Sequence, residues 1–144
     1  MDDGFTISDD KTKLDLDVIH GFLSTAYWSE GIPRARVARA IQHSLCFGVY
    51  ETASGRQIGF GRVISDFAVM AHLSDVFILD AYRGRGLGKR LVATILAHPE
   101  LQNLRRWSLA TNDAHELYRQ FGFGPLPAPE TQMLKLDPEA YSRP

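Results

Sequence analysis

Apolar and polar positions change their spacing several times along the chain, and this predicts alternating strands and helices. Two-residue alternation or short apolar runs favour strands at residues 5–8, 45–51, 57–65, 69–79, 107–111 and 132–136. Apolar residues three and four apart favour helices after Asp15, at residues 34–44, from Leu87 to before Pro99, and from an Asp113–Glu116 capping box to Gly122. This order predicts an α/β (α+β) fold, with a mixed sheet between helices on both faces.

Length and charge narrow the class of protein. A chain of 144 residues is expected to form one domain over residues 1–144. Its 16 Lys and Arg against 17 Asp and Glu give a net charge of -1, which offers no basic field for nucleic acid. No apolar run approaches the roughly 18 residues of a membrane span, and the acidic start does not resemble a secretory signal. We expect a cytoplasmic protein that binds neither nucleic acid nor membrane.

Cysteine usage limits the chemistry further. Cys46 is the only cysteine, so an internal disulfide and a cysteine-built metal site are excluded, and we expect no metal. Cys46 also stands inside a strand pattern, where cysteine usually packs as a small apolar side chain. A covalent acyl-enzyme is therefore not expected.

The segment from residue 83 to residue 90 carries the strongest chemical signal. Its glycines alternate at Gly84, Gly86 and Gly88, between a buried strand and an amphipathic helix, and they allow a ligand to approach the backbone. The start of the following helix favours an anion. Four cations surround the glycines: Arg83, Arg85, Lys89 and Arg90. The segment predicts a phosphate-bearing ligand, and a glycine turn with a solvated basic face is the alternative.

Two common nucleotide fingerprints do not fit this segment. Lys89 stands where the dinucleotide-binding pattern G-x-G-x-x-G needs its third glycine. The P-loop pattern fails because Arg90, and not Ser or Thr, follows Gly88-Lys89, and because Arg83 replaces its first glycine. Binding of a free nucleotide is therefore disfavoured.

The same segment resembles the acyl-CoA pyrophosphate loop of the GNAT superfamily of N-acyltransferases, R/Q-x-x-G-x-G/A. The strand residues before it and the segment 114–123, which follows A-x-x-L-Y-x-x-x-G-F, also resemble that family. The resemblance covers nearly the whole chain. It implies a mixed, mostly antiparallel central sheet flanked by helices on both faces. It also implies an acetyl-CoA-dependent N-acetyltransferase that acts on a primary amine by direct attack in a ternary complex.

The resemblance assigns the cofactor residues. Those implied to bind acetyl-CoA are Val76, Phe77 and Ile78 through their backbone, and Arg83, Gly84, Arg85, Gly86, Gly88 and Lys89 around the pyrophosphate. In the family a bulged strand splays from its neighbour, and the pantetheine arm lies in the gap. One strand N–H would then stabilise the oxyanion. An ordinary core strand is compatible with the same residues.

The resemblance also assigns the catalytic residues. Tyr118 stands at the usual position of the general acid, although it could equally lie on the buried face of a short helix. Asp75 resembles the position where many relatives carry an acidic general base, and turn chemistry is its alternative. Weaker candidates for the base are His72, Asp66 and His115. Thr111 replaces an asparagine that often contacts the cofactor, so that contact is in doubt.

The acceptor site is expected to lie in the N-terminal half. Tyr27, Trp28 and Glu30 occupy the loop that lines the acceptor cleft in relatives, although packing against the next helix would also explain the aromatic residues. A basic helix face carries Arg36, Arg39 and His43; if it borders the cleft, an acceptor with a carboxylate is favoured. We expect a small-molecule or peptide amine as the partner, and the sequence leaves open whether the protein forms a homodimer. The alternative function is a non-catalytic acyl-CoA sensor or interaction module on the same fold.

Overall fold

One mixed sheet forms the centre of the computed structural model, which describes residues 3–143. Positions 1, 2 and 144 of the predicted domain lie outside the described residues. The strands are β1 (Phe5–Ser8), β2 (Leu45–Glu51), β3 (Gln57–Ser65), β4 (Met70–Ile78) and β5 (Arg106–Ser108). They lie side by side in chain order, with antiparallel pairing everywhere except between β4 and β5. The expected mixed, mostly antiparallel sheet is confirmed.

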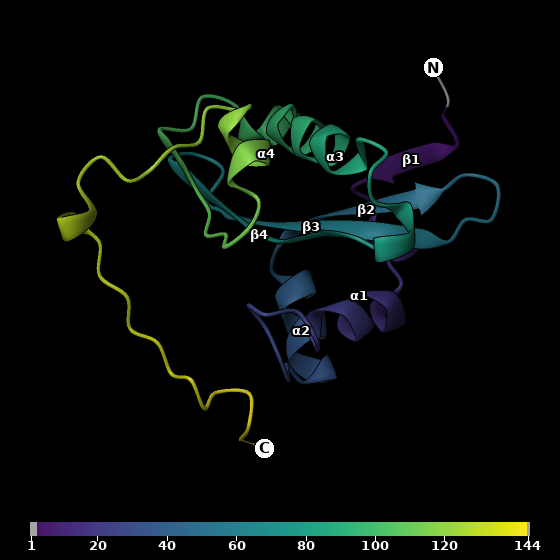
Figure 1. The fold of residues 1–144 in the computed structure, drawn as a ribbon, viewed down its shortest axis with the longest axis horizontal. Helices are drawn as coiled ribbons and strands as arrows, with labels where there is room; N and C mark the ends of the chain where they lie inside the picture. The colour runs from purple at the N-terminus through teal and green to yellow at the C-terminus, as the bar shows by residue number, and fades with distance from the viewer. Residues whose placement is uncertain (1–2, 144) are drawn as a thin grey trace.

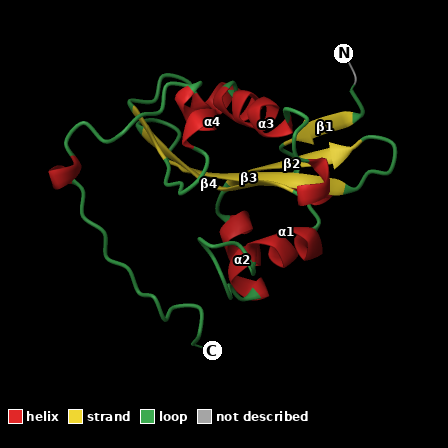
Figure 2. Cartoon of the chain, in the orientation of Figure 1, coloured by secondary structure: helices red, strands yellow, loops and turns green. Residues whose placement is uncertain are grey.

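Helices cover both faces of this sheet, as predicted (Figure 1). On one face lie α1 (Leu16–Leu23) and α2 (Arg34–Gln42), and on the other α3 (Leu87–Leu96) and α4 (His115–Arg119). Figure 2 shows the two helical layers in red on either side of the yellow strands. Each layer has its own core: Ile19, Leu23 and Val37 pack on the first face, and Leu87, Leu91, Val92 and Ile95 on the second. Within residues 3–143, no helix has both the length and the apolarity to cross a membrane.

Of two helix caps predicted from the sequence, one is present and one is not. Asp15 caps α1, because its side chain accepts hydrogen bonds from the backbone N–H groups of residues 17 and 18. The capping box predicted at Asp113 is wrong. The backbone N–H of Ala114 donates instead to Thr111 Oγ1 at 3.1 Å, and α4 begins one residue later than a cap at Asp113 would require.

The strand predicted at residues 132–136 is also wrong. The chain follows a helical turn at Pro129–Thr131 and then runs without regular structure away from the sheet (Figure 1). Met133 and Leu134 are 98% and 84% exposed. A strand needs a partner edge for its backbone hydrogen bonds. This segment meets no such edge among the described residues, so its apolar pattern does not produce a strand.

A bulge and a gap in pairing shape the middle of the sheet. Phe77 pairs with Phe60 and Ser74 with Arg62, so β4 carries one residue more than β3 between these pairs. The bulge lies at Asp75, whose φ of 56° is unusual for a residue with a side chain. On the other side, pairing with β5 ends at His72. The second half of β4 therefore has a free backbone edge.

Candidate active site

The free edge of β4 forms one wall of a groove of 320 Å³, here called the glycine-loop groove. Its other walls are the glycine segment before α3 and the start of α4. The lining residues are Phe22, Trp28, Val76, Phe77, Ile78, Tyr82, Arg83, Gly84, Gly86, Leu87, Gly88, Asp113, Ala114, Leu117 and Tyr118. The strand and glycine motifs therefore meet the segment around Tyr118, about 30 residues further along the chain, around one space.

Backbone N–H groups dominate the loop end of this groove. Gly84 and Gly86 have φ angles of 79° and 75°, in the left-handed region that glycine tolerates. Gly86 is the N-cap of α3 and has no side-chain cap, and the first helix N–H with an internal partner is that of Arg90. Within the described chain, the six N–H groups of residues 84–89 have no acceptor. Such a run of N–H groups at a helix start binds anions, and phosphate in particular.

The cationic side chains of the loop contribute less to the groove than the sequence indicates. Arg83 lines it, and its Nε donates to the Ile78 carbonyl at 3.1 Å, which ties the loop to the end of β4. Arg85 lies over the Phe5 and Tyr82 rings, with the guanidinium carbon 5.9 and 5.5 Å from their centroids. Neither Arg85 nor Lys89 lines the groove. The hydrogen-bond donors at this end of the groove are therefore mainly backbone N–H groups, with Arg83 as the one cationic side chain of the loop that lines it.

Tyr118 lines both the groove and a second cavity of 240 Å³, here called the β4 cavity. Its side chain is buried, and no described residue forms a hydrogen bond with its hydroxyl. Burial raises the pKa of Tyr118 to about 12, with smaller contributions from Tyr27 and Asp113. The phenol is therefore protonated at neutral pH and free to donate a proton or a hydrogen bond.

His72 lies in the β4 cavity with Tyr118. Its Nδ1 is 2.9 Å from Ser108 Oγ, which orients the ring. Burial, and to a smaller extent the positive charge of Arg62, lowers the pKa of His72 from its ordinary value of 6.5. The imidazole is therefore neutral at pH 7 and able to accept a proton.

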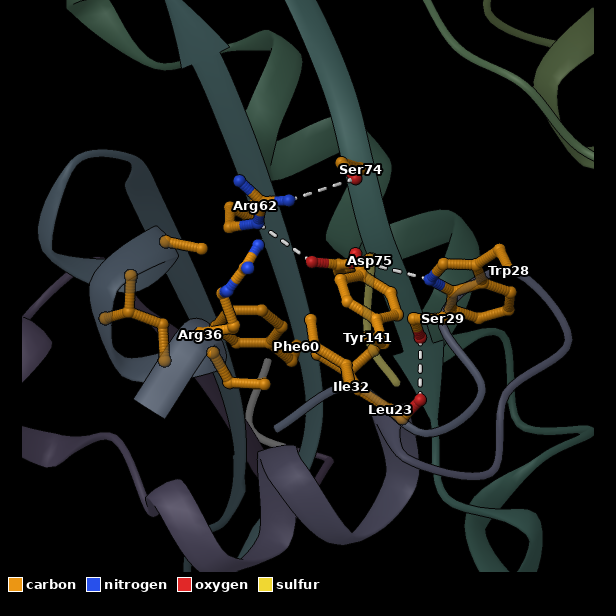
Figure 3. A pocket seen from close by; sticks show the side chains of 13 residues that line it. Leu23, Trp28, Ser29, Ile32, Arg36, Phe60, Arg62, Ser74, Asp75 and Tyr141 are labelled. Carbon is orange, nitrogen blue, oxygen red and sulfur yellow. Dashed lines mark hydrogen bonds and ion pairs between the residues drawn. The ribbon is translucent and has the colours of Figure 1, made fainter. Parts of the chain in front are cut away.

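Asp75 holds the bulge in place through two side-chain partners (Figure 3). Arg62 Nε donates to one carboxylate oxygen and Trp28 Nε1 to the other, both at 2.8 Å. The Arg62 and Asp75 side chains are only 16% and 10% exposed. Arg62 is not among the residues predicted for the site, because its only signal in the sequence is a charge between the apolar residues of β3.

The three residues predicted for the acceptor site differ in whether they line a cavity. Trp28 lines the glycine-loop groove and the β4 cavity, and it also lines a third cavity of 280 Å³ beside α2, here called the α2 cavity. Tyr27 lines the β4 cavity, and its hydroxyl accepts a hydrogen bond from the backbone N–H of Asn112 at 2.8 Å. Glu30 is exposed and lines none of these three cavities.

The family is decided by comparison with known proteins. The GNAT acetyltransferase domain, as a family model, matches residues 42–125, which is more than half of the chain. The chain belongs to the GNAT family. The match includes the bulge, the glycine segment and Tyr118, but it begins after the aromatic loop and most of α2. The aromatic loop and most of α2 of this GNAT protein therefore lie outside the matched segment.

Individual GNAT relatives agree with this assignment. A crystal structure of a proposed GNAT acetyltransferase from Xanthomonas campestris pv. campestris is 49% identical, with a TM-score of 0.91, over 96% of this chain and 97% of that one. A curated protein of Gibberella zeae, whose name proposes acetyltransferase activity, is 28% identical over 79% of this chain and 75% of its own length. A GNAT acetyltransferase from Elizabethkingia anophelis with acetyl-CoA bound shares the fold, with 11% identity and a TM-score of 0.63, over 83% and 75% of the two chains.

Proposed function

We propose that this chain is an N-acetyltransferase that uses acetyl-CoA and transfers the acetyl group to a primary amine by direct attack in a ternary complex. The observation that carries the proposal is the run of six unpaired N–H groups in residues 84–89, next to the free edge of β4. The N–H groups offer a site for an anionic end of a ligand. The free edge of β4 offers backbone groups that can hydrogen-bond an extended part of the same ligand. Acetyl-CoA has this combination, with a pyrophosphate and a pantetheine arm.

The residues present fit acetyl-CoA. The N–H groups of residues 84–89 would hold the pyrophosphate, and the guanidinium of Arg83 stands beside them. The free edge of Val76–Ile78 would hydrogen-bond the pantetheine as an added strand does. Bound there, acetyl-CoA supplies an activated acetyl thioester. A backbone N–H of this edge would polarise its carbonyl.

His72 and Tyr118 are assigned the proton transfers of the reaction. His72 accepts a proton from the ammonium form of the substrate, and the neutral amine nitrogen then forms a bond with the acetyl carbon. As the bond from that carbon to sulfur breaks, Tyr118 donates a proton to the departing sulfur, and its phenolate regains a proton from the nitrogen, which becomes the amide nitrogen. The support is positional, because both side chains line the β4 cavity and Tyr118 also lines the groove.

Asp75 is assigned a positioning role in this proposal. Each of its carboxylate oxygens already accepts a hydrogen bond, from Arg62 or from Trp28. These contacts fix the bulge and the Trp28 ring at the junction of the cavities. Because His72 has no such charged partner, it is the better candidate for the base.

Direct transfer, without an acyl-enzyme, is supported by the position of Cys46. Its side chain is 1% exposed and lines none of the three cavities. Burial raises the pKa of its thiol to about 11, so the nucleophilic thiolate is almost absent at neutral pH.

Thermal unfolding with acetyl-CoA tests the cofactor assignment. At a ligand concentration near 100 times Kd, a ligand that binds only the folded state stabilises it by about 2.7 kcal/mol. For a chain of this length we expect Tm to rise by about 3–6 °C with acetyl-CoA and not with ATP. An equal shift with both ligands, or no shift with either, would contradict the assignment.

The pH dependence of kcat tests the base. Because the pKa of His72 lies below 6.5, the imidazole is neutral above that pH, so kcat should fall only as the pH decreases below about 6.5. His72→Gln should lower kcat by about 100-fold and remove this acidic limb. Asp75→Asn should lower stability, since it removes the carboxylate partner of a largely buried Arg62, yet retain the limb. If Asp75→Asn removes the limb and His72→Gln does not, Asp75 is the base.

A further inference from the structure

A charged side chain without a partner faces the α2 cavity, which the proposed reaction does not otherwise use. We infer that the acetyl acceptor is a small amine that also carries a carboxylate, and that Arg36 binds this carboxylate. The inference rests on the proposed function, because it describes the second substrate of that reaction. Three observations support it: the charge balance of the cavity, the lining residues that the cavity shares with the β4 cavity, and its size.

The two arginines that line the α2 cavity differ in whether their charge is neutralised. Arg62 is neutralised by Asp75, and its two remaining nitrogens contact Ser44 Oγ at 3.1 Å and Ser74 Oγ at 3.4 Å. The Arg36 guanidinium forms no ion pair or hydrogen bond with any residue in the range 3–143, and the only bond of this residue outside the regular helix pattern is that of its backbone N–H with the Pro33 carbonyl. No other acidic side chain lines the cavity. Its charged groups therefore leave one positive charge without compensation.

Arg36 is placed to use that charge on a ligand. It lies on α2, and Figure 3 shows its guanidinium directed into the cavity, on the same side as Arg62. The neighbouring Arg39 does not line the cavity; it lines a hollow on the outer surface of α2, which Arg36 and Arg143 also line. Of these two arginines on α2, only Arg36 therefore reaches the cavity.

The α2 cavity adjoins the place where the amine would react. It shares Trp28, Ser74 and Asp75 with the β4 cavity, which contains His72 and Tyr118, and the 2.8 Å hydrogen bond between Trp28 and Asp75 joins two of these shared residues. We therefore expect a ligand with its carboxylate at Arg36 to present its amine beside Trp28, near the free edge of β4. A carboxylate and an amine at opposite ends match this arrangement.

The size of the two spaces favours a small acceptor. The α2 and β4 cavities measure 280 and 240 Å³, each just below the roughly 300–1,000 Å³ of most ligand pockets. Tyr141, from the C-terminal segment, also lines the α2 cavity (Figure 3). A folded protein would have to place a lysine beneath this segment, whereas an amino acid needs no such access.

The test compares amino acids with their carboxamides, which keep the amine and lose the negative charge. The release of the CoA thiol measures the rate of acetyl transfer. A charge-assisted hydrogen bond predicts that kcat/KM for the carboxylate form exceeds that for the amide by about 10- to 100-fold, mainly through KM. Arg36→Gln should remove this preference and leave kcat/KM for the amide nearly unchanged. Arg36→Lys, which keeps the charge, should restore part of it.

Arg39→Gln is the matched control, because it removes the same charge from the same helix outside the cavity. It should keep the preference for the carboxylate. Equal use of acid and amide by the wild type, or equal losses in Arg36→Gln and Arg39→Gln, would overturn the inference.

Failure of the proposed function gives a different result. If no amine is acetylated although acetyl-CoA raises Tm, calorimetric titration of the acetyl-CoA-loaded protein with the same amino acids decides. Binding that Arg36→Gln abolishes would support the carboxylate site and reject the enzyme, whereas absence of binding would reject both. Without any acetyl-CoA shift, the proposed function fails and the acceptor inference falls with it.

Discussion

Replacing Tyr118 with phenylalanine is expected to lower kcat by about 100- to 10,000-fold, the usual range for loss of a general acid. The change removes only the hydroxyl, which has no hydrogen-bond partner among the described residues and stands between the groove and the β4 cavity. The ring still packs edge-on against Phe123, with centroids 5.9 Å apart. Neither stability nor acetyl-CoA binding should change much. Steady-state kinetics and the Tm shift with acetyl-CoA measure the two effects separately.

Tyr82→Phe is the matched control for this variant. Tyr82 lines the same groove, but its hydroxyl lies 3.4 Å from Glu51, away from the β4 cavity. The Tyr82→Phe variant should retain most of the activity.

Wild-type turnover in Tyr118→Phe would contradict the assignment of Tyr118 as the general acid. If the wild type binds acetyl-CoA but acetylates no amine, the non-catalytic acyl-CoA sensor becomes the better interpretation.

The strands show which part of the fold a local pattern can predict. Strands β2 and β3 were predicted with the boundaries observed, because both are buried and paired on either side. The pattern at residues 132–136 is similarly apolar, yet these residues are exposed without a partner strand. A local pattern records the preference of a segment for strand conformation. It contains no information on whether a neighbouring edge is available.

The candidate site likewise has one part that the local sequence predicts and one part that it does not. The glycine segment could be predicted, since positive φ angles and unpaired helix N–H groups follow from a few consecutive residues. The contact between Trp28 and Asp75, 47 residues apart, could not be predicted. It depends on the bulge at Asp75, which arises from a mismatch in pairing between two strands. The orientation of Arg36 toward a cavity likewise depends on how α2 packs against the sheet.

Replacing Gly86 with glutamate is expected to abolish acetyl-CoA binding while the protein remains folded. An added Cβ meets no atom within 4 Å, so the direct cost is that of a side chain at a φ of 75°, about 1–2 kcal/mol. The carboxylate would, however, stand at the N-cap of α3, among the N–H groups proposed to hold the pyrophosphate. Repulsion between like charges about 4 Å apart costs up to about 4 kcal/mol near a protein surface, which corresponds to an affinity loss of up to about 1,000-fold.

Gly55→Glu separates this repulsion from backbone strain. Gly55 has a φ of 74° and equally open surroundings, but it lies in the turn between β2 and β3, away from the groove. Both variants should lose a similar few degrees of Tm, because they introduce the same residue at nearly the same backbone angle. Only Gly86→Glu should lose the Tm increase with acetyl-CoA, whereas Gly86→Ala should keep much of it. If Gly86→Glu retains wild-type affinity, the N–H groups before α3 do not bind the pyrophosphate, and the cofactor assignment fails with them.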